Sequence, residues 1–296
     1  MSTAKAGLPG PAGVWAGSFR LQDSGLVRDA AAELDELGYG VLWFPGGTSR
    51  TFDVASTLLS GTRRSMVATG IANIWVNPPA EAAARTASLN AQHGNRFLLG
   101  LGVSHQPMVE QLRPGEWRSP LDAMSTYLDE LSRGRTVVPR RSMVLAALGP
   151  KMLDLARSRT AGTHPYLVTP DQTAAIRDRI GPGALVAVEQ GVVLDSAASS
   201  GRATARKALE MYLGLPNYVS NWKRAGFTSD DVAGGGSDRL VDALIARGSP
   251  AQVVSRVREH LSAGADHVCL QVLGFPGTTL PRQAWRELAS ALELRA

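Results

Sequence analysis

The chain has 296 residues, of which 44% are hydrophobic and 19% are charged, a composition typical of a folded globular protein. Its formal net charge is +5, but the basic residues form no dense stripe with interleaved aromatic residues, so we expect no nucleic-acid partner. No apolar run approaches the ~20 residues that span a bilayer, and the amino terminus lacks the apolar core of a signal peptide. We therefore expect a cytoplasmic protein with no membrane partner.

Eight short apolar runs alternate with amphipathic stretches along the chain. The runs are typical of buried strands and cover residues 13–17, 41–44, 66–73, 97–103, 143–148, 164–168, 190–194 and 267–273. The stretches between them have the apolar periodicity of helices, as at residues 26–37 and 121–131. This alternation predicts an α/β protein with a (β/α)8 TIM barrel over residues 13–296, preceded by a flexible tail over residues 1–12. A doubly wound sheet is the alternative.

Residues 66–107 show the pattern most clearly. An apolar run ends near Asn73, a helix signature opens at Pro78-Pro79, and a second apolar run follows Gly94. Strand, helix and strand at this spacing form a βαβ unit with parallel strands. The carboxyl ends of both strands carry small or polar residues, namely Gly70, Asn73, Gly102, Ser104 and His105. Ligands of α/β folds bind at that edge, so we expect the site there.

Two insertions interrupt the alternation. Residues 106–120 follow strand four, and residues 215–248 lie between strands seven and eight. Long loops on the ligand side of a barrel usually shape or cover the pocket, although either one could instead serve a dimer contact.

Two residues in predicted strands have expected structural roles. Cys269 is the single cysteine of the chain and lies in an apolar strand, so we expect it in the core. Glu189 is expected to begin strand seven and to pair with an arginine at the bottom of the barrel.

The sequence lacks the usual chemical motifs. It has no Gly-x-Gly-x-x-Gly at a helix start and no histidine pair at metal-ligand spacing. We therefore expect no metal, and a bound organic cofactor that carries the chemistry. Gly149-Pro150-Lys151 opens a predicted helix, whose free N–H groups could bind a phosphate or simply form a turn. His105 is the candidate for proton transfer, because imidazole titrates near neutral pH.

Five segments together resemble the luciferase-like monooxygenase superfamily, in particular its branch of oxidoreductases that depend on the deazaflavin coenzyme F420. They are LGYGVLWFP, ATGIANIWVNPP, RFLLGLGVSH, ALGPKMLDLA and ADHVCLQVL, in that order, and they extend over nearly the whole chain. The resemblance implies hydride transfer between the deazaflavin and a small organic substrate that the sequence does not identify. It also implies a homodimer that pairs through the helices at residues 26–37 and 78–90.

The resemblance also implies a set of cofactor contacts. The tricyclic ring would lie in the barrel mouth, supported by a non-proline cis peptide bond between Gly70 and Ile71, with Asn73 near the ring. Ser104, His105 and Gln106 stand where relatives have Gly-Trp-Asn, and Gln106 would hold the ring edge. Phosphate loops would fall at Leu148, Gly149 and Pro150, and again from Tyr166 to Thr169.

The chain departs from the family in two further places. Relatives often end strand two with an acidic residue, where this chain has Pro45-Gly46-Gly47. An Ala-Asp-Gly turn before strand six is replaced by Thr160-Ala161-Gly162. Two alternative functions therefore stay open: an FMN-dependent monooxygenase, and a degenerate barrel that binds a ligand without catalysis.

Overall fold

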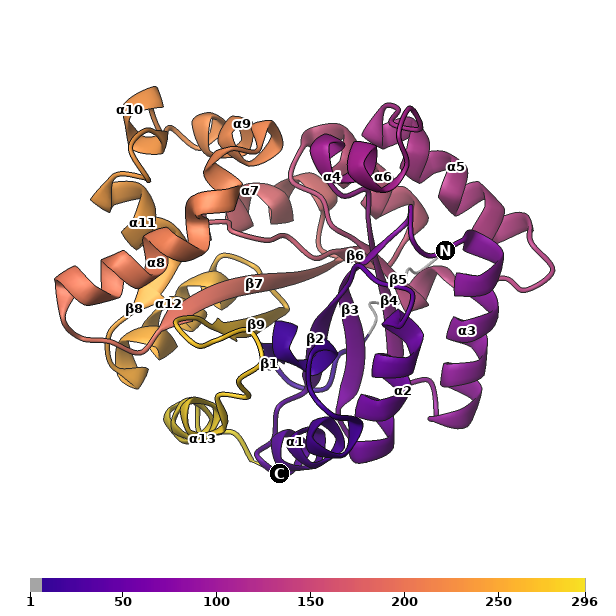
Figure 1. The fold of residues 1–296 in the computed structure, drawn as a ribbon, viewed down its shortest axis with the longest axis horizontal. Helices are drawn as coiled ribbons and strands as arrows, with labels where there is room; N and C mark the ends of the chain where they lie inside the picture. The colour runs from indigo at the N-terminus through magenta and orange to yellow at the C-terminus, as the bar shows by residue number, and fades with distance from the viewer. Residues whose placement is uncertain (1–6, 296) are drawn as a thin grey trace.

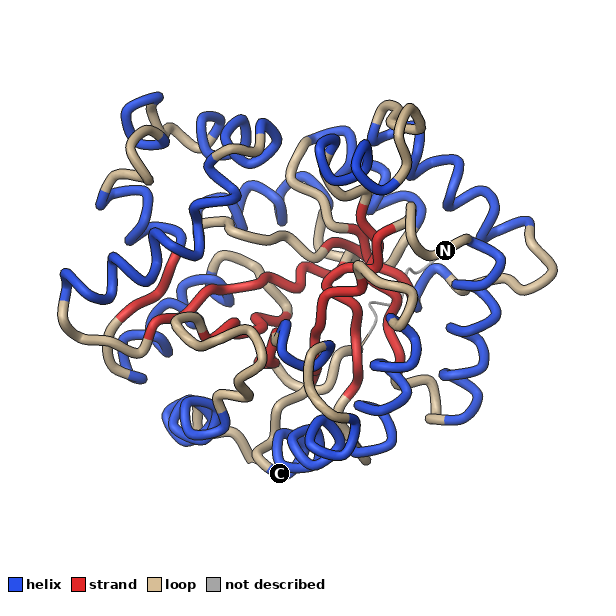
Figure 2. Tube along the Cα trace, viewed as in Figure 1, coloured by secondary structure: helices blue, strands red, loops and turns tan. Residues whose placement is uncertain are grey.

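Eight parallel strands close into a barrel in the computed structural model, which describes residues 7–295 (Figure 1 and Figure 2). The order around the barrel is β6-β5-β4-β3-β2-β1-β9-β7, and pairing of β6 with β7 closes it. The strands are β1 (Ala12–Trp15), β2 (Val41–Gly46), β3 (Met66–Asn73), β4 (Phe97–Gly102), β5 (Met143–Leu145), β6 (Gly162–Thr163), β7 (Leu185–Val193) and β9 (His267–Val272). The predicted (β/α)8 barrel is confirmed.

One further strand lies outside the barrel. β8 (Ile245–Arg247) pairs with the end of β7 from Gly191 to Val193 and ends the second insertion. The sequence did not predict it, because three residues are too few to show a strand period.

One predicted strand is in the wrong position, and another was predicted too short. Strand six was placed at residues 164–168, but β6 ends at Thr163 and those residues form the loop that follows it. Strand seven was placed at residues 190–194, but β7 already begins at Leu185. The polar Glu189 marked a false boundary within this long buried strand.

Helices cover the outside of the barrel (Figure 1 and Figure 2). They are α1 (Ser24–Glu36), α2 (Thr51–Gly61), α3 (Pro79–Gln92), α5 (Pro120–Arg133), α6 (Pro150–Arg159), α7 (Pro170–Ile180), α8 (Ala198–Leu213), α12 (Pro250–Ser262) and α13 (Arg282–Ala291), with short 3-10 turns η1 (Gly17–Arg20) and η2 (Arg140–Ser142). Several begin with proline at their first turn, where the missing N–H costs nothing. No helix within residues 7–295 is long and apolar enough to cross a membrane.

The barrel interior is filled with side chains rather than open. Its buried cluster contains Val41, Trp43, Ala68, Leu98, Val144, Leu185, Ala187 and Cys269. Cys269 is fully buried there, as predicted.

The amino-terminal segment lies against the bottom of the barrel. Residues 1–6 of the predicted tail lie outside the described residues. Leu8 packs against the interior cluster, and the carbonyl of Gly10 lies 3.1 Å from Nδ1 of His267. The carbonyl of Pro11 accepts a 2.8 Å hydrogen bond from the N–H of Val268. These contacts close the end of the barrel opposite the ligand edge.

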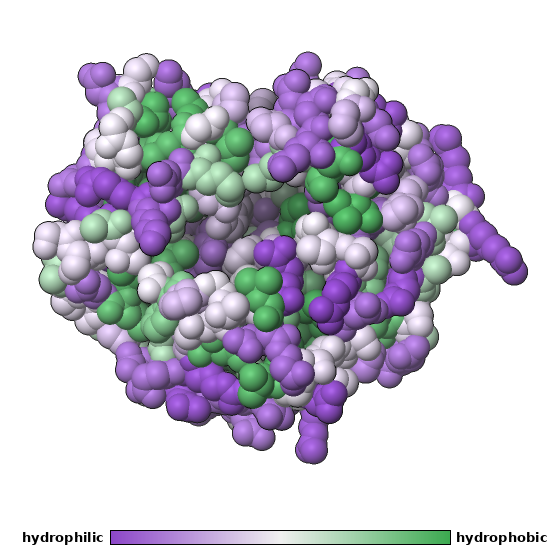
Figure 3. Space-filling model, in the orientation of Figure 1, coloured by the Kyte–Doolittle hydropathy of each residue, from purple (hydrophilic) through white to green (hydrophobic). Residues whose placement is uncertain are grey.

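Both insertions border the ligand edge. The first contains α4 (Gln106–Leu112), and the second contains α9 (Pro216–Arg224), α10 (Ser229–Val232) and α11 (Asp238–Leu244). Figure 3 shows a hollow in the middle of this face, between the positions of α9 and α4 in Figure 1.

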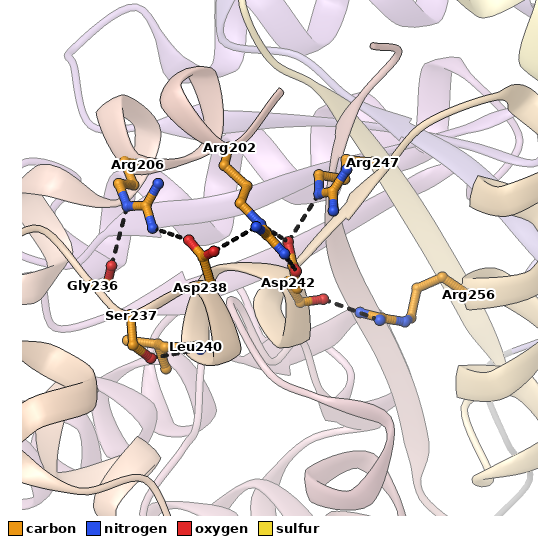
Figure 4. A network of polar contacts seen from close by, with 9 residues as sticks. All are labelled: Arg202, Arg206, Gly236, Ser237, Asp238, Leu240, Asp242, Arg247 and Arg256. Carbon is orange, nitrogen blue, oxygen red and sulfur yellow. Dashed lines mark hydrogen bonds and ion pairs between the residues drawn. The ribbon is translucent and has the colours of Figure 1, made fainter. Parts of the chain in front are cut away.

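A network of arginines and aspartates ties the second insertion to the barrel (Figure 4). Arg202 on α8 donates to both Asp238 and Asp242 on α11. Arg247 on β8 donates to Asp242 across 2.9 Å, and Arg256 on α12 donates to the backbone carbonyl of the same aspartate across 3.2 Å. Asp242 therefore joins α11 to α8, β8 and α12.

Candidate active site

A cavity of about 880 Å³ opens at the carboxyl ends of β3, β4 and β5. This volume lies in the range of small-molecule sites. The predicted site residues that line it are Ile71, Ser104, His105, Gln106, Leu148, Gly149 and Tyr166. They come from four separate segments of the chain, which the barrel brings together.

Four predicted contacts do not line the cavity. Gly70 lies directly behind Ile71, and the side chain of Asn73 accepts a 3.0 Å hydrogen bond from the N–H of Trp75 within the turn after β3. Pro150 is the first residue of α6. Thr169 caps α7, since its side chain accepts a hydrogen bond from the N–H of Gln172. Their observed roles are in local structure.

The bond between Gly70 and Ile71 is cis, as the resemblance implied. The pairing register of β3 with β4 shifts between Ala68 and Ala72 at this point. The Ile71 side chain fills the space above Gly102, where an added Cβ would lie 2.5 Å from Ile71 Cδ1. Glycine is required at 102 for this close approach, and Ile71 forms part of the cavity floor.

Gly46, the last residue of β2, has no room for a side chain. A Cβ at Gly46 would lie 2.7 Å from the Thr51 side chain and 2.8 Å from Ala72 Cα. Close packing of β2 against β3 therefore requires glycine at 46, whereas a Cβ at Gly47 would meet only Arg20 Nη1, at 3.8 Å. The Pro45-Gly46-Gly47 ending supplies no carboxylate to the cavity.

His105 stands at the cavity rim. It is the residue before α4 and is half-buried, with its ring 5.8 Å from that of Tyr218. Burial lowers the pKa of His105, while a hydrogen bond with the Asn217 side chain opposes this shift. At neutral pH the imidazole is thus mainly neutral and can accept a proton.

His164 is a site residue that the sequence analysis did not single out. It is buried and lines the cavity. Its Nδ1 lies 2.8 Å from the carbonyl of Ala187, so Nδ1 carries the hydrogen and Nε2 is the acceptor. Nε2 has no hydrogen-bond partner within residues 7–295. Burial lowers the pKa of His164 to about 4, so the imidazole is neutral at pH 7. Nε2 lies beside Gly70, where an added Cβ would be 2.9 Å from it.

One end of the cavity suits an anion. Gly149 precedes α6 without any side-chain cap, and the space around it is open, with nothing within 4 Å of an added Cβ. The first N–H groups of α6 are directed there, together with the positive end of the helix dipole. Arg224 on α9 also lines the cavity, and its guanidinium lies 3.5 Å from the carbonyl of Leu148. The sequence analysis missed Arg224, because no local pattern shows where an inserted helix docks.

Aromatic rings form the side of the cavity nearest the second insertion. Tyr166 and Tyr218 line it, and Tyr212 packs against both with centroid distances of 5.4 and 5.0 Å. The Tyr166 hydroxyl donates a 2.8 Å hydrogen bond to the side chain of Gln271 on β9. The ring planes are inclined to one another by 43° to 76°, so the three tyrosines form an interlocked, largely apolar wall.

Comparisons with known proteins bear on the family and the fold. A sequence model described as luciferase-like monooxygenase matches residues 11–267. A comparison with curated protein sequences gave no match.

Three solved structures show the same fold at low sequence identity. The coenzyme F420-dependent tetrahydromethanopterin reductase from Methanopyrus kandleri has a TM-score of 0.73 at 15% identity, covering 96% of this chain and 98% of that one. An F420-dependent secondary alcohol dehydrogenase has 0.70 at 13%, covering 95% and 98%. The oxygenating constituent of 3,6-diketocamphane monooxygenase from Pseudomonas putida, in complex with FMN, has 0.66 at 14%, covering 96% and 97%.

Proposed function

Because this chain belongs to the luciferase-like monooxygenase family, we propose that it is an oxidoreductase that binds coenzyme F420 and uses it to oxidise or reduce a small organic substrate. The observation that carries the proposal is the shape and chemistry of the large cavity. It is a mainly apolar space of about 880 Å³ with an anion-binding end at α6 and Arg224. A flat ring joined to a phosphate requires such a site.

The residues present fit the deazaflavin. Ile71 and the aromatic wall would hold the ring, and Nε2 of His164 would accept a hydrogen bond from a ring N–H, which would satisfy its buried lone pair. The Gly149 turn and Arg224 would hold the phosphate. When bound, F420 supplies two-electron chemistry by accepting or donating a hydride.

The protein itself contributes orientation, desolvation and proton transfer. The walls of the cavity exclude water from the reacting pair and hold it in one relative orientation. His105 is mainly neutral and lies at the rim, so it can take the proton from a substrate oxygen and exchange it with solvent.

An FMN-dependent monooxygenase is the second candidate. The FMN-bound structural neighbour favours it, and FMN also has a phosphate that would suit the α6 end. The Pro45-Gly46-Gly47 ending of β2 supports the third possibility, a barrel that binds a ligand without catalysis.

Titration of the purified apoprotein with F420 and with FMN distinguishes the three candidate functions. We expect a dissociation constant of about 1 μM or lower for F420, and binding at least about tenfold weaker for FMN. The reverse preference, with turnover that requires oxygen, would favour the monooxygenase. Tight binding without hydride transfer to any carbonyl or alcohol tested would favour the non-catalytic barrel.

A further inference from the structure

The carboxyl group of Glu189 is enclosed near the barrel mouth. Glu189 is 1% exposed and follows Leu185 and Ala187 along β7, two residues of the interior cluster, so its side chain points into the barrel. Its Oε2 accepts a 3.3 Å hydrogen bond from the N–H of Leu167, whereas Oε1 has no hydrogen-bond partner within residues 7–295. The expected arginine is not there: no arginine in this range forms a salt bridge or hydrogen bond with it.

A second, smaller cavity lies beside this carboxyl. It has a volume of about 230 Å³, and Glu189, Gly191, Tyr212 and Gln271 are among its lining residues. A Cβ at Gly191 would lie 3.8 Å from Glu189 Oε1. The same Cβ would lie closer to the Ile245 and Leu273 side chains, at 2.7 and 3.2 Å, so the unpartnered oxygen is buried beside the cavity rather than open to it. The cavity volume is sufficient for water, for which Glu189, Tyr212 and Gln271 supply polar partners.

Tyr166 forms the wall between the small cavity and the large one, since it lines both. Its hydroxyl accepts a 3.2 Å hydrogen bond from the Tyr212 hydroxyl and donates to Gln271. A hydroxyl can accept on one side and donate on the other, so Tyr166 connects the Glu189 cavity to the proposed cofactor cavity.

Only one group in this cluster titrates near neutral pH. The titratable groups that face Glu189 are Tyr166 after β6, Tyr212 on α8, Tyr218 on α9 and Cys269 on β9. Burial raises the pKa of all four above their ordinary values, and it raises the pKa of Glu189 to about 8. Glu189 therefore holds a proton at pH 7 that it can release.

We propose that Glu189 is a buried proton donor for the ligand in the large cavity and that it acts through the Tyr166 hydroxyl. This inference rests on the proposed function. F420, when bound, would supply the acceptor for the hydride of an alcohol and would take up one proton with it. His105 would take the proton of the alcohol oxygen, Tyr166 would deliver the proton to the cofactor, and Glu189 would replace it across the small cavity. Solvent then removes the proton from His105 and returns one to Glu189, so charge balances, and reduction of a carbonyl reverses each transfer.

The first test is an infrared pH titration of the apoprotein, in which the C=O band of a protonated carboxyl disappears as the group ionises. We expect one such band at about pH 6 with a midpoint near 8, absent in Glu189→Gln. The exposed Glu210 on α8 is the control, and Glu210→Gln should keep the band. If Glu189 is already ionised at about pH 6, the proposal is overturned.

The second test repeats the measurement with F420 or FMN bound. Contact between the ligand and Tyr166 changes the hydrogen bonding behind it, so the Glu189 band should shift in frequency. In Tyr166→Phe the band should stay unshifted although the ligand still binds. A ligand that binds the unmodified protein without moving the band overturns the role of Glu189 and leaves the proposed function standing. If neither cofactor binds, both proposals fail, and the apoprotein titration still shows whether Glu189 stores a proton.

Discussion

The imidazole of His164 lies flat against the indole of Trp43, with ring centroids 4.1 Å apart and ring planes 9° apart. Stacking fixes the ring plane, and the contact of Nδ1 with the Ala187 carbonyl fixes its rotation. The acceptor Nε2 is therefore held in one position beside Gly70, just below the cavity that His164 lines.

Replacing His164 by phenylalanine should weaken cofactor binding. His164→Phe keeps a ring that can stack on Trp43 but removes the acceptor, so we expect a dissociation constant about tenfold higher, the value of one hydrogen bond. Cofactor fluorescence titration measures it. His93→Phe, at the end of α3 and away from the cavity, is the control and should bind as the unmodified protein does. Equal affinity in His164→Phe would show that the ligand makes no hydrogen bond to Nε2.

Two substitutions of Gly149 should show whether a negative charge, rather than an added side chain, weakens binding at the phosphate end of the cavity. Gly149 has φ −88°, and an added Cβ meets nothing within 4 Å, so other residues fit without strain. Gly149→Asp places a carboxylate beside the bound phosphate and should weaken binding about tenfold. Gly149→Asn has nearly the same shape without the charge and should weaken it much less. Both should preserve or raise the melting temperature, because Asp and Asn are good helix N-caps. Equal binding by the two variants would place the phosphate elsewhere.

Asp242 should control the stability of the second insertion. Asp242→Asn breaks contacts with Arg202 and Arg247 at once, and we expect a loss of about 1–2 kcal/mol and a melting temperature lower by roughly 2–6 °C. Asp53→Asn removes a solvent-exposed ion pair with Arg85 and should have little effect. Equal melting temperatures for both variants would contradict a structural role for the network.

Asp242 should also make the stability of the fold depend on pH. Hydrogen bonds from Arg202 are the main reason that the pKa of Asp242 falls to about 2, below the unfolded value of ~3.9. A carboxyl with a depressed folded pKa stabilises the fold above its unfolded pKa, and this stabilisation is lost as pH falls from ~4 through about 2. Acid unfolding of Asp242→Asn should therefore be less steep than that of the unmodified protein in this interval.

His105→Ala should lower the chemical step by roughly 10²–10⁴-fold if the imidazole carries a proton, with a much smaller change in cofactor affinity. The measurement is single-turnover reduction or oxidation of the bound cofactor once a substrate is known. The pKa of His105 is lowered and that of Glu189 is about 8. The pH profile should therefore rise on the acid side with His105 and fall near 8 with Glu189. Full turnover in His105→Ala would make this histidine structural.

We also expect a homodimer that pairs through α1 and α3. Leu26 on α1 is 49% exposed and would become buried if this helix paired with its copy in a symmetric dimer. Light scattering at micromolar concentration should give twice the chain mass, and Leu26→Glu should give a monomer. Val137→Glu changes a similarly exposed residue outside both helices and should remain dimeric.

The fold could be predicted because the same alternation of apolar strands and amphipathic helices is repeated along the chain. Each strand and helix of a barrel buries an apolar face, so the alternation recurs along the chain and one error does not change the topology. β6 has two residues, Gly162 and Thr163, which is too few to show a period. The more apolar loop after it was therefore mistaken for the strand. That error concealed the position of His164.

Site residues could be predicted only where they come soon after a strand in the sequence. His105 and Gly149 come directly after β4 and near the end of β5, and the ends of parallel strands share one edge. Arg224 reaches the cavity from an inserted helix, whose position depends on contacts distant in sequence. Glu189 was misread because buried carboxylates usually pair with arginine. Here no arginine within residues 7–295 pairs with the carboxyl, and burial raises its pKa to about 8.

Segments near both ends of the described residues pack against one turn between α1 and β2. A Cβ at Gly40 would collide with the carbonyl of Pro9, and one at Gly38 would lie 2.6 Å from the carbonyl of Arg295. A side chain at Gly40 would displace the segment before β1, and one at Gly38 would displace the residues after α13. Two glycines in one turn thus allow both segments to pack against the barrel.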